Sequence, residues 1–142
     1  MSKKLEILHA SATLFTTGNH FAEASEEHIC ELYNLEPAPA NTEGYDAIKR
    51  KGSKIKRVQI KGRSLNKSGG TSPLDGVKPD GFDIMIALIV DKYKPIGYLE
   101  ITSDYFYSHA TYRNDDSKPG YALTIGKKFL QEYLSEKPSK TI

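Results

Sequence analysis

The sequence predicts an α/β fold, with a mixed central β-sheet flanked by helices, from three patterns. A helical period runs through residues 19–33, two strands of alternating side chains meet at a turn around Gly52, and a continuous apolar run occupies Ile84 to Val90. At 142 residues and 38% hydrophobic composition, the chain has the size of one domain with one core. We therefore expect residues 1–142 to form a single domain.

The N-terminal third is predicted to be helical. A first helix is expected over residues 3–15 and a second from Asn19 to Tyr33. The period of the second helix places six residues on one face: Ala22, Ser25, Glu26, Ile29, Leu32 and Tyr33. Glu26 is thus expected to face the core, and a carboxylate that faces inward needs a partner, a proton or a metal.

A β-hairpin is predicted next. Tyr45 to Arg50 and Lys54 to Gly62 read as strands, joined by the turn Lys51 to Ser53. In the second strand, alternation of side chains places Val58 and Ile60 on one face. Arg57, Gln59 and Lys61 therefore project together from the other face.

The remaining elements follow from apolar runs and capping residues. Ser64 to Gly81, which is polar and contains Gly and Pro, is expected to be one long loop that forms a mobile flap. Ile84 to Val90 is typical of a central strand, and Pro95 to Thr102 is expected to pair with it. Asp83, at the entrance of the central strand, is expected to cap or pair with a strand-end amide. Two short helices are predicted, capped by Ser103 or Asp104 and by Thr124.

The charge distribution is uneven. The segment from Lys49 to Lys67 carries nine basic residues and no acid, whereas the rest of the chain has 11 basic and 18 acidic residues. Such segregation suits an anionic partner, although a solvated lysine-rich hairpin gives the same pattern.

Cysteine content and hydropathy bound the cellular setting. Cys30 is the only cysteine, which excludes an internal disulfide framework and a zinc site built from several thiolates. The N-terminal segment lacks the apolar block of a signal peptide, and the longest apolar run is too short to cross a bilayer. We expect a cytoplasmic protein without a membrane partner.

The hairpin carries residue types that suit a hard cation beside a phosphodiester. Magnesium takes oxygen ligands and keeps several waters, so the Asp46 carboxylate, the Gln59 amide oxygen and the Ile60 carbonyl can hold it once phosphate oxygens join. Lys61, on the same face as Gln59, is placed to orient an attacking water and to stabilise charge on the phosphate. Glu26 would complete the site from the helix, directly or through water.

These residues resemble the motif of the PD-(D/E)xK nuclease superfamily, which has the restriction-endonuclease-like fold. The likeness lies in Asp46-x12-Gln59-Ile60-Lys61 preceded by Glu26, and it spans about Asn19 to Thr102. Two positions depart from the family pattern: Gly44 and Tyr45 precede the Asp where the motif name has Pro, and Gln59 stands in place of an acid. The second departure removes one negative charge from the metal site.

The resemblance implies a DNA endonuclease that depends on Mg²⁺ or Mn²⁺ and acts in restriction, phage defence or DNA processing. It assigns catalytic roles to Glu26, Asp46, Gln59 and Lys61 and metal ligation to Asp46, Gln59 and Ile60. Phosphate contacts are expected from Arg57, Arg63 and Lys67, and a homodimer would let two sites cut two strands. Two alternatives remain open: an inactive nucleic-acid-binding module of the same fold, and a protein-interaction subunit.

Overall fold

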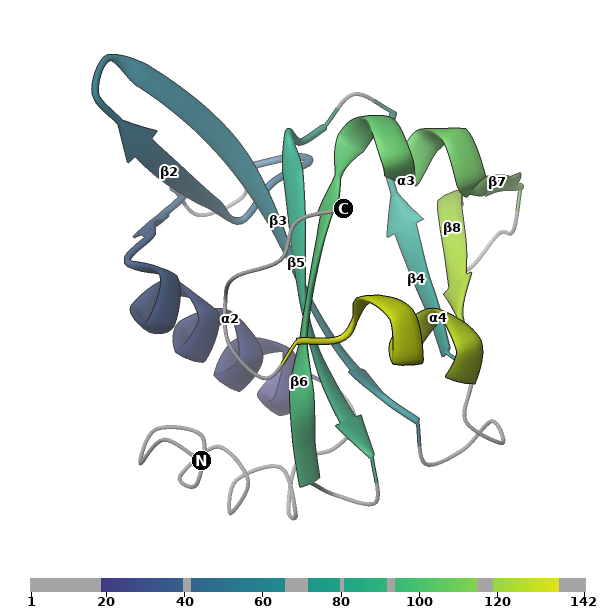
Figure 1. Ribbon diagram of the computed structural model, residues 1–142. Helices are drawn as coiled ribbons and strands as arrows, with labels where there is room; N and C mark the ends of the chain where they lie inside the picture. Colours follow the sequence, from purple (N-terminus) through teal and green to yellow (C-terminus); the bar gives the residue numbers. More distant parts are fainter. Residues whose placement is uncertain are drawn as a thin grey trace.

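The computed structural model describes residues 19–39, 42–65, 72–79, 81–91, 94–114 and 119–135. The helix expected over residues 3–15 lies outside these ranges, as does Lys67. Within them, a central sheet separates a long helix on one face from a second sheet and two short helices on the other (Figure 1). The prediction of a mixed α/β fold is confirmed at this level.

The central sheet is mixed. Its strands, in spatial order, are β1 (Glu36–Pro37), β2 (Ala47–Lys51), β3 (Lys54–Ser64), β5 (Ile84–Asp91) and β6 (Lys94–Thr102). Only β3 and β5 run parallel, and the other neighbours are antiparallel. The apolar run of β5 lies inside the sheet and is buried over most of its length, as its composition predicts.

Helix α2 (Asn19–Tyr33) covers one face of this sheet, with the bounds that the periodicity predicts. The predicted buried face is only partly right. Ser25 and Ile29 are buried, but Ala22 is exposed, and Phe21 and His28 are buried in addition. The rotation of the helix therefore differs slightly from the periodicity-based prediction.

The opposite face of the central sheet packs against a second sheet that the sequence did not predict. Its strands are β4 (Ser72–Val77), β8 (Gly120–Ile125) and β7 (Thr111–Arg113), in the order β4-β8-β7. The expected flap from Ser64 to Gly81 is wrong where it includes β4, because Leu74 and Val77 are buried in the core between the sheets. The two sheets enclose an apolar cluster that includes Phe82 and Phe106.

Two short helices complete the described chain. α3 (Ser103–His109) is capped by Thr102, whose side chain accepts the N–H of Tyr105, so the predicted caps are wrong by one and two residues. α4 (Lys127–Tyr133) begins after Gly126. The predicted cap of this helix, Thr124, lies instead in β8, where it pairs with β4. None of the described helices has both the length and the apolar composition needed to cross a bilayer.

Strands β2 and β3 extend beyond the body of the protein as a two-stranded arm (Figure 1). We call residues Ile48 to Arg57 the basic arm. Its turn contains Gly52 at φ 65°, a left-handed conformation that glycine adopts without a steric penalty. The predicted hairpin is confirmed, but β2 begins two residues and ends one residue later than expected, and β3 ends two residues later.

Candidate metal and phosphate site at the sheet edge

Asp46 is held at the edge of β3, at the point where β2 begins. Its backbone N–H donates to the Val58 carbonyl at 2.8 Å. Its Oδ2 accepts two hydrogen bonds at 2.8 Å, one from the Ile60 N–H and one from the Gln59 Nε2. Pairing between β2 and β3 ends at Ala47 and Val58, so the side chain of Asp46 satisfies a strand amide that β2 does not reach. The lone acid of the hairpin thus has a fixed position.

The backbone of Ile60 presents a carbonyl to the same edge. In an extended strand the N–H and C=O of one residue point to the same side, and the Ile60 N–H points at Asp46. The Ile60 carbonyl oxygen is therefore directed towards the edge beside the carboxylate, as expected of a cation ligand.

Gln59 is oriented differently from the expectation. Its amide nitrogen, not its oxygen, faces Asp46. A half-turn about the terminal bond of the side chain would exchange the two atoms and present the oxygen. Gln59 in this structure acts as a donor that fixes the carboxylate, and a ligand role requires that rotation.

Glu26 reaches this edge from the other side of the sheet. Val58 and Ile60 pack towards α2, whereas Gln59 and Lys61 alternate to the opposite face, so Glu26 and these side chains approach Asp46, just before β2 begins, from opposite faces of β3. Burial raises the pKa of Glu26, and the nearby negative charge of Asp46 raises it further. Within the described chain the carboxylate accepts no hydrogen bond, and the two acids therefore share a region of negative potential.

Lys61 contributes the opposing charge. Burial raises the pKa of Asp46, while the Ile60 N–H and the positive charge of Lys61 lower it and only partly offset the burial. The structure thus brings Asp46, Gln59 and Ile60 into direct contact and places Glu26 and Lys61 within electrostatic range of them.

Arg57 forms a local structural contact. Its backbone N–H donates to Asp83 Oδ2 at 2.7 Å, and its guanidinium contacts the same carboxylate at 3.2 and 3.3 Å. The hydrogen bonds from Arg57 lower the pKa of Asp83. The expectation that Asp83 pairs with a strand-end amide is confirmed. A phosphate bound by Arg57, as predicted, would compete with Asp83 for the guanidinium.

Arg63 joins the two sheets. Its guanidinium donates to the Pro73 carbonyl at 2.8 Å and to Asp75 Oδ1 at 2.9 Å, and the side chains of the ion pair are 23% and 15% exposed. Arg63 therefore attaches β4 to β3. A phosphate contact by Arg63 stays a prediction, in competition with this pair.

An acidic groove that the sequence did not predict adjoins the site along the outer side of α2. It has a volume of about 590 Å³ and is lined by Glu23, Glu26, Glu27, Cys30, Glu31, Asn34, Leu35 and Pro37. The spacing of Glu23, Glu27 and Glu31, one helical turn apart, is the signal that would have predicted it. The glutamates of this groove would repel a polyanion on this side of α2.

Cys30 lies in the groove but is chemically quiet. Burial raises the pKa of its thiol to about 11, and the charges of Glu26 and Asp46 add to the shift. A raised pKa favours the protonated thiol, which is the less nucleophilic form.

The donor set suits magnesium better than a transition metal. In the described part of the chain, no three His, Cys, Asp or Glu side chains come together. The edge offers the carboxylates of Asp46 and Glu26 and the Ile60 carbonyl, oxygen donors of the kind that Mg²⁺ takes while retaining waters, whereas the Gln59 amide presents its nitrogen.

No protein-family model matches the chain, and no curated protein matches it significantly.

Proposed function

We propose that the protein is a metal-dependent DNA nuclease that hydrolyses phosphodiester bonds at the edge of β3. The observation that carries the proposal is the fixed carboxylate of Asp46, held by Gln59 and Ile60, with Glu26 and Lys61 contributing opposite charges beside it. Burial and then the negative charge of Asp46 raise the pKa of Glu26, and a cation beside the two acids would remove this repulsion.

Each residue has a chemical role in this proposal. Asp46, Glu26 and the Ile60 carbonyl would hold Mg²⁺ or Mn²⁺, which when bound lowers the pKa of a water and screens the phosphate charge. Lys61 orients the attacking water and stabilises the charge that grows on the phosphate oxygens. Gln59 keeps the Asp46 carboxylate in place and reaches the cation only after its amide turns.

The fold supports this assignment in outline. A mixed central sheet with α2 on one face agrees with the resemblance to restriction-endonuclease-like proteins, and the motif residues lie on α2, β3 and the residue before β2. The second sheet on the opposite face departs from a sheet covered by helices alone. We propose the restriction-endonuclease-like fold because the motif residues and their positions in the structure both fit it.

A second candidate is a nucleic-acid-binding module of the same fold that does not cut. The orientation of Gln59 favours it, because a neutral side chain that donates to Asp46 leaves the proposed cation with one ligand fewer. Both candidates predict binding of DNA, and they differ only in hydrolysis.

Cleavage of supercoiled plasmid in Mg²⁺ or Mn²⁺ separates the two candidates. We expect the wild type to nick or linearise the plasmid, and Asp46→Asn and Lys61→Met each to reduce the rate by about 10²- to 10³-fold, the range for loss of one charge-stabilising group. Asp104→Asn and Lys128→Met are matched controls, because both residues are exposed and lie on α3 and α4. Wild-type cutting no faster than that of either site variant would contradict the nuclease and leave the binding module. Absence of DNA binding at low salt would contradict both and favour a protein-interaction subunit.

A further inference from the structure

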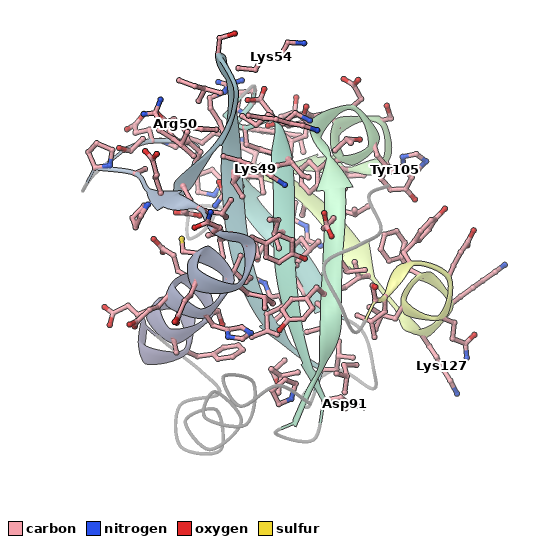
Figure 2. All side chains as sticks on the ribbon, turned by 60° about the vertical axis from the view of Figure 1, so that its left-hand side comes forward. Lys49, Arg50, Lys54, Asp91, Tyr105 and Lys127 are labelled. Carbon is pink, nitrogen blue, oxygen red and sulfur yellow. The ribbon has the colours of Figure 1, made fainter. Side chains whose placement is uncertain are left out.

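The basic arm has two chemically different faces. Residues directly opposite in an antiparallel pair share a face, and the pairs Lys49 with Lys56 and Lys51 with Lys54 alternate with the pairs Ile48 with Arg57 and Arg50 with Ile55. Four lysines therefore project from one face, and we call Lys49, Lys51, Lys54 and Lys56 the lysine quartet. Figure 2 shows Lys49 and Lys54 on one side of the arm and Arg50 on the other.

The two faces also differ in their partners. On the arginine face, Arg50 pairs with Glu36 at 2.7 Å and Arg57 pairs with Asp83 at 3.2 Å. All members of the lysine quartet are exposed, and none forms an ion pair with an acid in the described part of the chain. The arginines thus have acidic partners at short distance and the quartet has none in the described part of the chain, although the charge of Lys56 also helps to lower the pKa of Asp83.

The quartet opposes folding of the arm. Like charges that face each other across antiparallel strands are destabilising, and the arm has two such pairs in succession. A Lys–Glu pair at either position would stabilise the arm. A local arrangement that lowers stability without a structural gain indicates a function.

We propose that the lysine quartet, which projects from the same face of the sheet as α2, grips the phosphate backbone of duplex DNA without sequence preference. A two-stranded ribbon fits the major groove of about 12 Å, and lysine is a compact point charge whose contacts to phosphates carry no sequence information. A protein partner with carboxylates would be better matched by the bidentate geometry of arginine, which is absent from this face.

The spacing along the arm fits a duplex. Lys49 and Lys51 lie three and five residues beyond Asp46, which corresponds to about 10 and 17 Å along an extended strand. At 3.4 Å per base-pair step, these distances equal about three to five steps of a duplex. The inference rests on the proposed function for the identity of the polymer, but it requires no metal and no hydrolysis.

The test is DNA binding in the presence of EDTA, measured by fluorescence anisotropy with a 30-base-pair duplex between 50 and 200 mM NaCl. Each phosphate contact contributes about 0.9 to the slope of log affinity against log salt. We expect Lys49→Gln/Lys56→Gln to make the slope less negative by about 1.8. The matched control Lys127→Gln/Lys128→Gln removes the same charge from the exposed surface of α4 and should leave the slope unchanged.

Several outcomes would overturn the proposal. An unchanged slope in the arm variant, or equal changes in the two variants, would show that the quartet is not the contact. Displacement of the duplex by polyglutamate at equal charge concentration would indicate an acidic protein partner instead.

The arm variant should melt no lower than the wild type, because it loses a like-charge pair, so misfolding does not obscure the result. Normal binding without cleavage in Mg²⁺ would contradict the nuclease and leave the quartet's role intact.

Discussion

The two faces of the central sheet are packed in different ways. Against α2, three polar residues are buried among the described residues: Ser25, His28 and Glu100. His28 Nε2 lies 2.6 Å from the Tyr98 hydroxyl, and the Tyr33 hydroxyl donates to Glu100 at 3.2 Å. Against the second sheet, the buried cluster consists of aliphatic and aromatic side chains.

This difference indicates what each face contributes. Apolar packing is non-directional and holds the second sheet in place wherever volumes match. Hydrogen bonds between buried groups are directional, so the polar contacts fix the position of α2 on the sheet. Since α2 carries Glu26, the polar face sets the geometry of the proposed site and the apolar face supplies general stability.

The largest loss of folding stability is expected from a substitution on the apolar face. Phe106 is fully buried and packs edge-on against Phe82 at a ring distance of 5.7 Å. Phe106→Ala should lower the free energy of unfolding by about 3–5 kcal/mol, measured by urea denaturation. Tyr112→Ala, at a side chain 58% exposed, should change it by less than about 0.5 kcal/mol. Equal losses in the two variants would contradict the assignment of the core.

A smaller effect is expected when the polar face loses one hydrogen bond. Tyr98→Phe removes the hydroxyl that meets His28 Nε2 and keeps the ring that stacks on it. We expect a loss of about 1–3 kcal/mol in the free energy of unfolding, the cost of leaving a buried polar atom without this partner. Tyr112→Phe is the exposed control. A neutral result for Tyr98→Phe would mean that the polar contact does not fix α2.

The site itself should make stability depend on pH. The folded-state pKa of Glu26 is raised above its ordinary value of 4.5, chiefly by burial and then by Asp46, so ionised Glu26 opposes folding. This cost is absent below pH 4.5 and develops as pH rises through the raised pKa. Glu26→Gln should therefore have a higher melting temperature than the wild type at pH 8 and the same melting temperature at pH 4. A Glu26→Gln variant less stable at pH 8 would show that the carboxylate has a stabilising partner.

The smallest change in folding stability is expected from a substitution of Ser25. Its Oγ is fully buried against Gly62 and has no hydrogen-bond partner in the described part of the chain. Ser25→Ala should raise the free energy of unfolding by up to about 1 kcal/mol, because it removes an unsatisfied polar atom. Thermal melts of the wild type, Ser25→Ala and the control Ser53→Ala, at an exposed turn position, measure this change in stability. A clear loss of stability would show that the hydroxyl is hydrogen-bonded in solution.

Much of the fold was predictable because its signals are local. Periodicity gave the bounds of α2, alternation around Gly52 gave the hairpin, and the apolar run gave β5. The second sheet was missed because β4 contains Pro, Asp and Gly and pairs with β8, a strand about fifty residues later in the chain. Such pairing depends on tertiary packing, which a local pattern does not carry.

The candidate site was predictable to the same extent. Strand alternation placed Gln59 and Lys61 together, and the structure adds that Asp46 is anchored by the Ile60 N–H. The acids that pair with Arg57 and Arg63 are distant in sequence, so their ion pairs were not apparent. The orientation of the Gln59 amide likewise depends on a hydrogen bond across the hairpin, not on residue type.

The central claim is that the edge of β3 beside Asp46 holds a divalent cation, and a crystal soaked in Mn²⁺ tests it most directly. We expect an anomalous peak about 2.0–2.6 Å from the Asp46 carboxylate, with the Ile60 carbonyl as a second ligand, and no such peak in Asp46→Asn. Cleavage of plasmid by a protein whose only Mn²⁺ peak lies elsewhere, or no peak at this edge at saturating Mn²⁺, would contradict it.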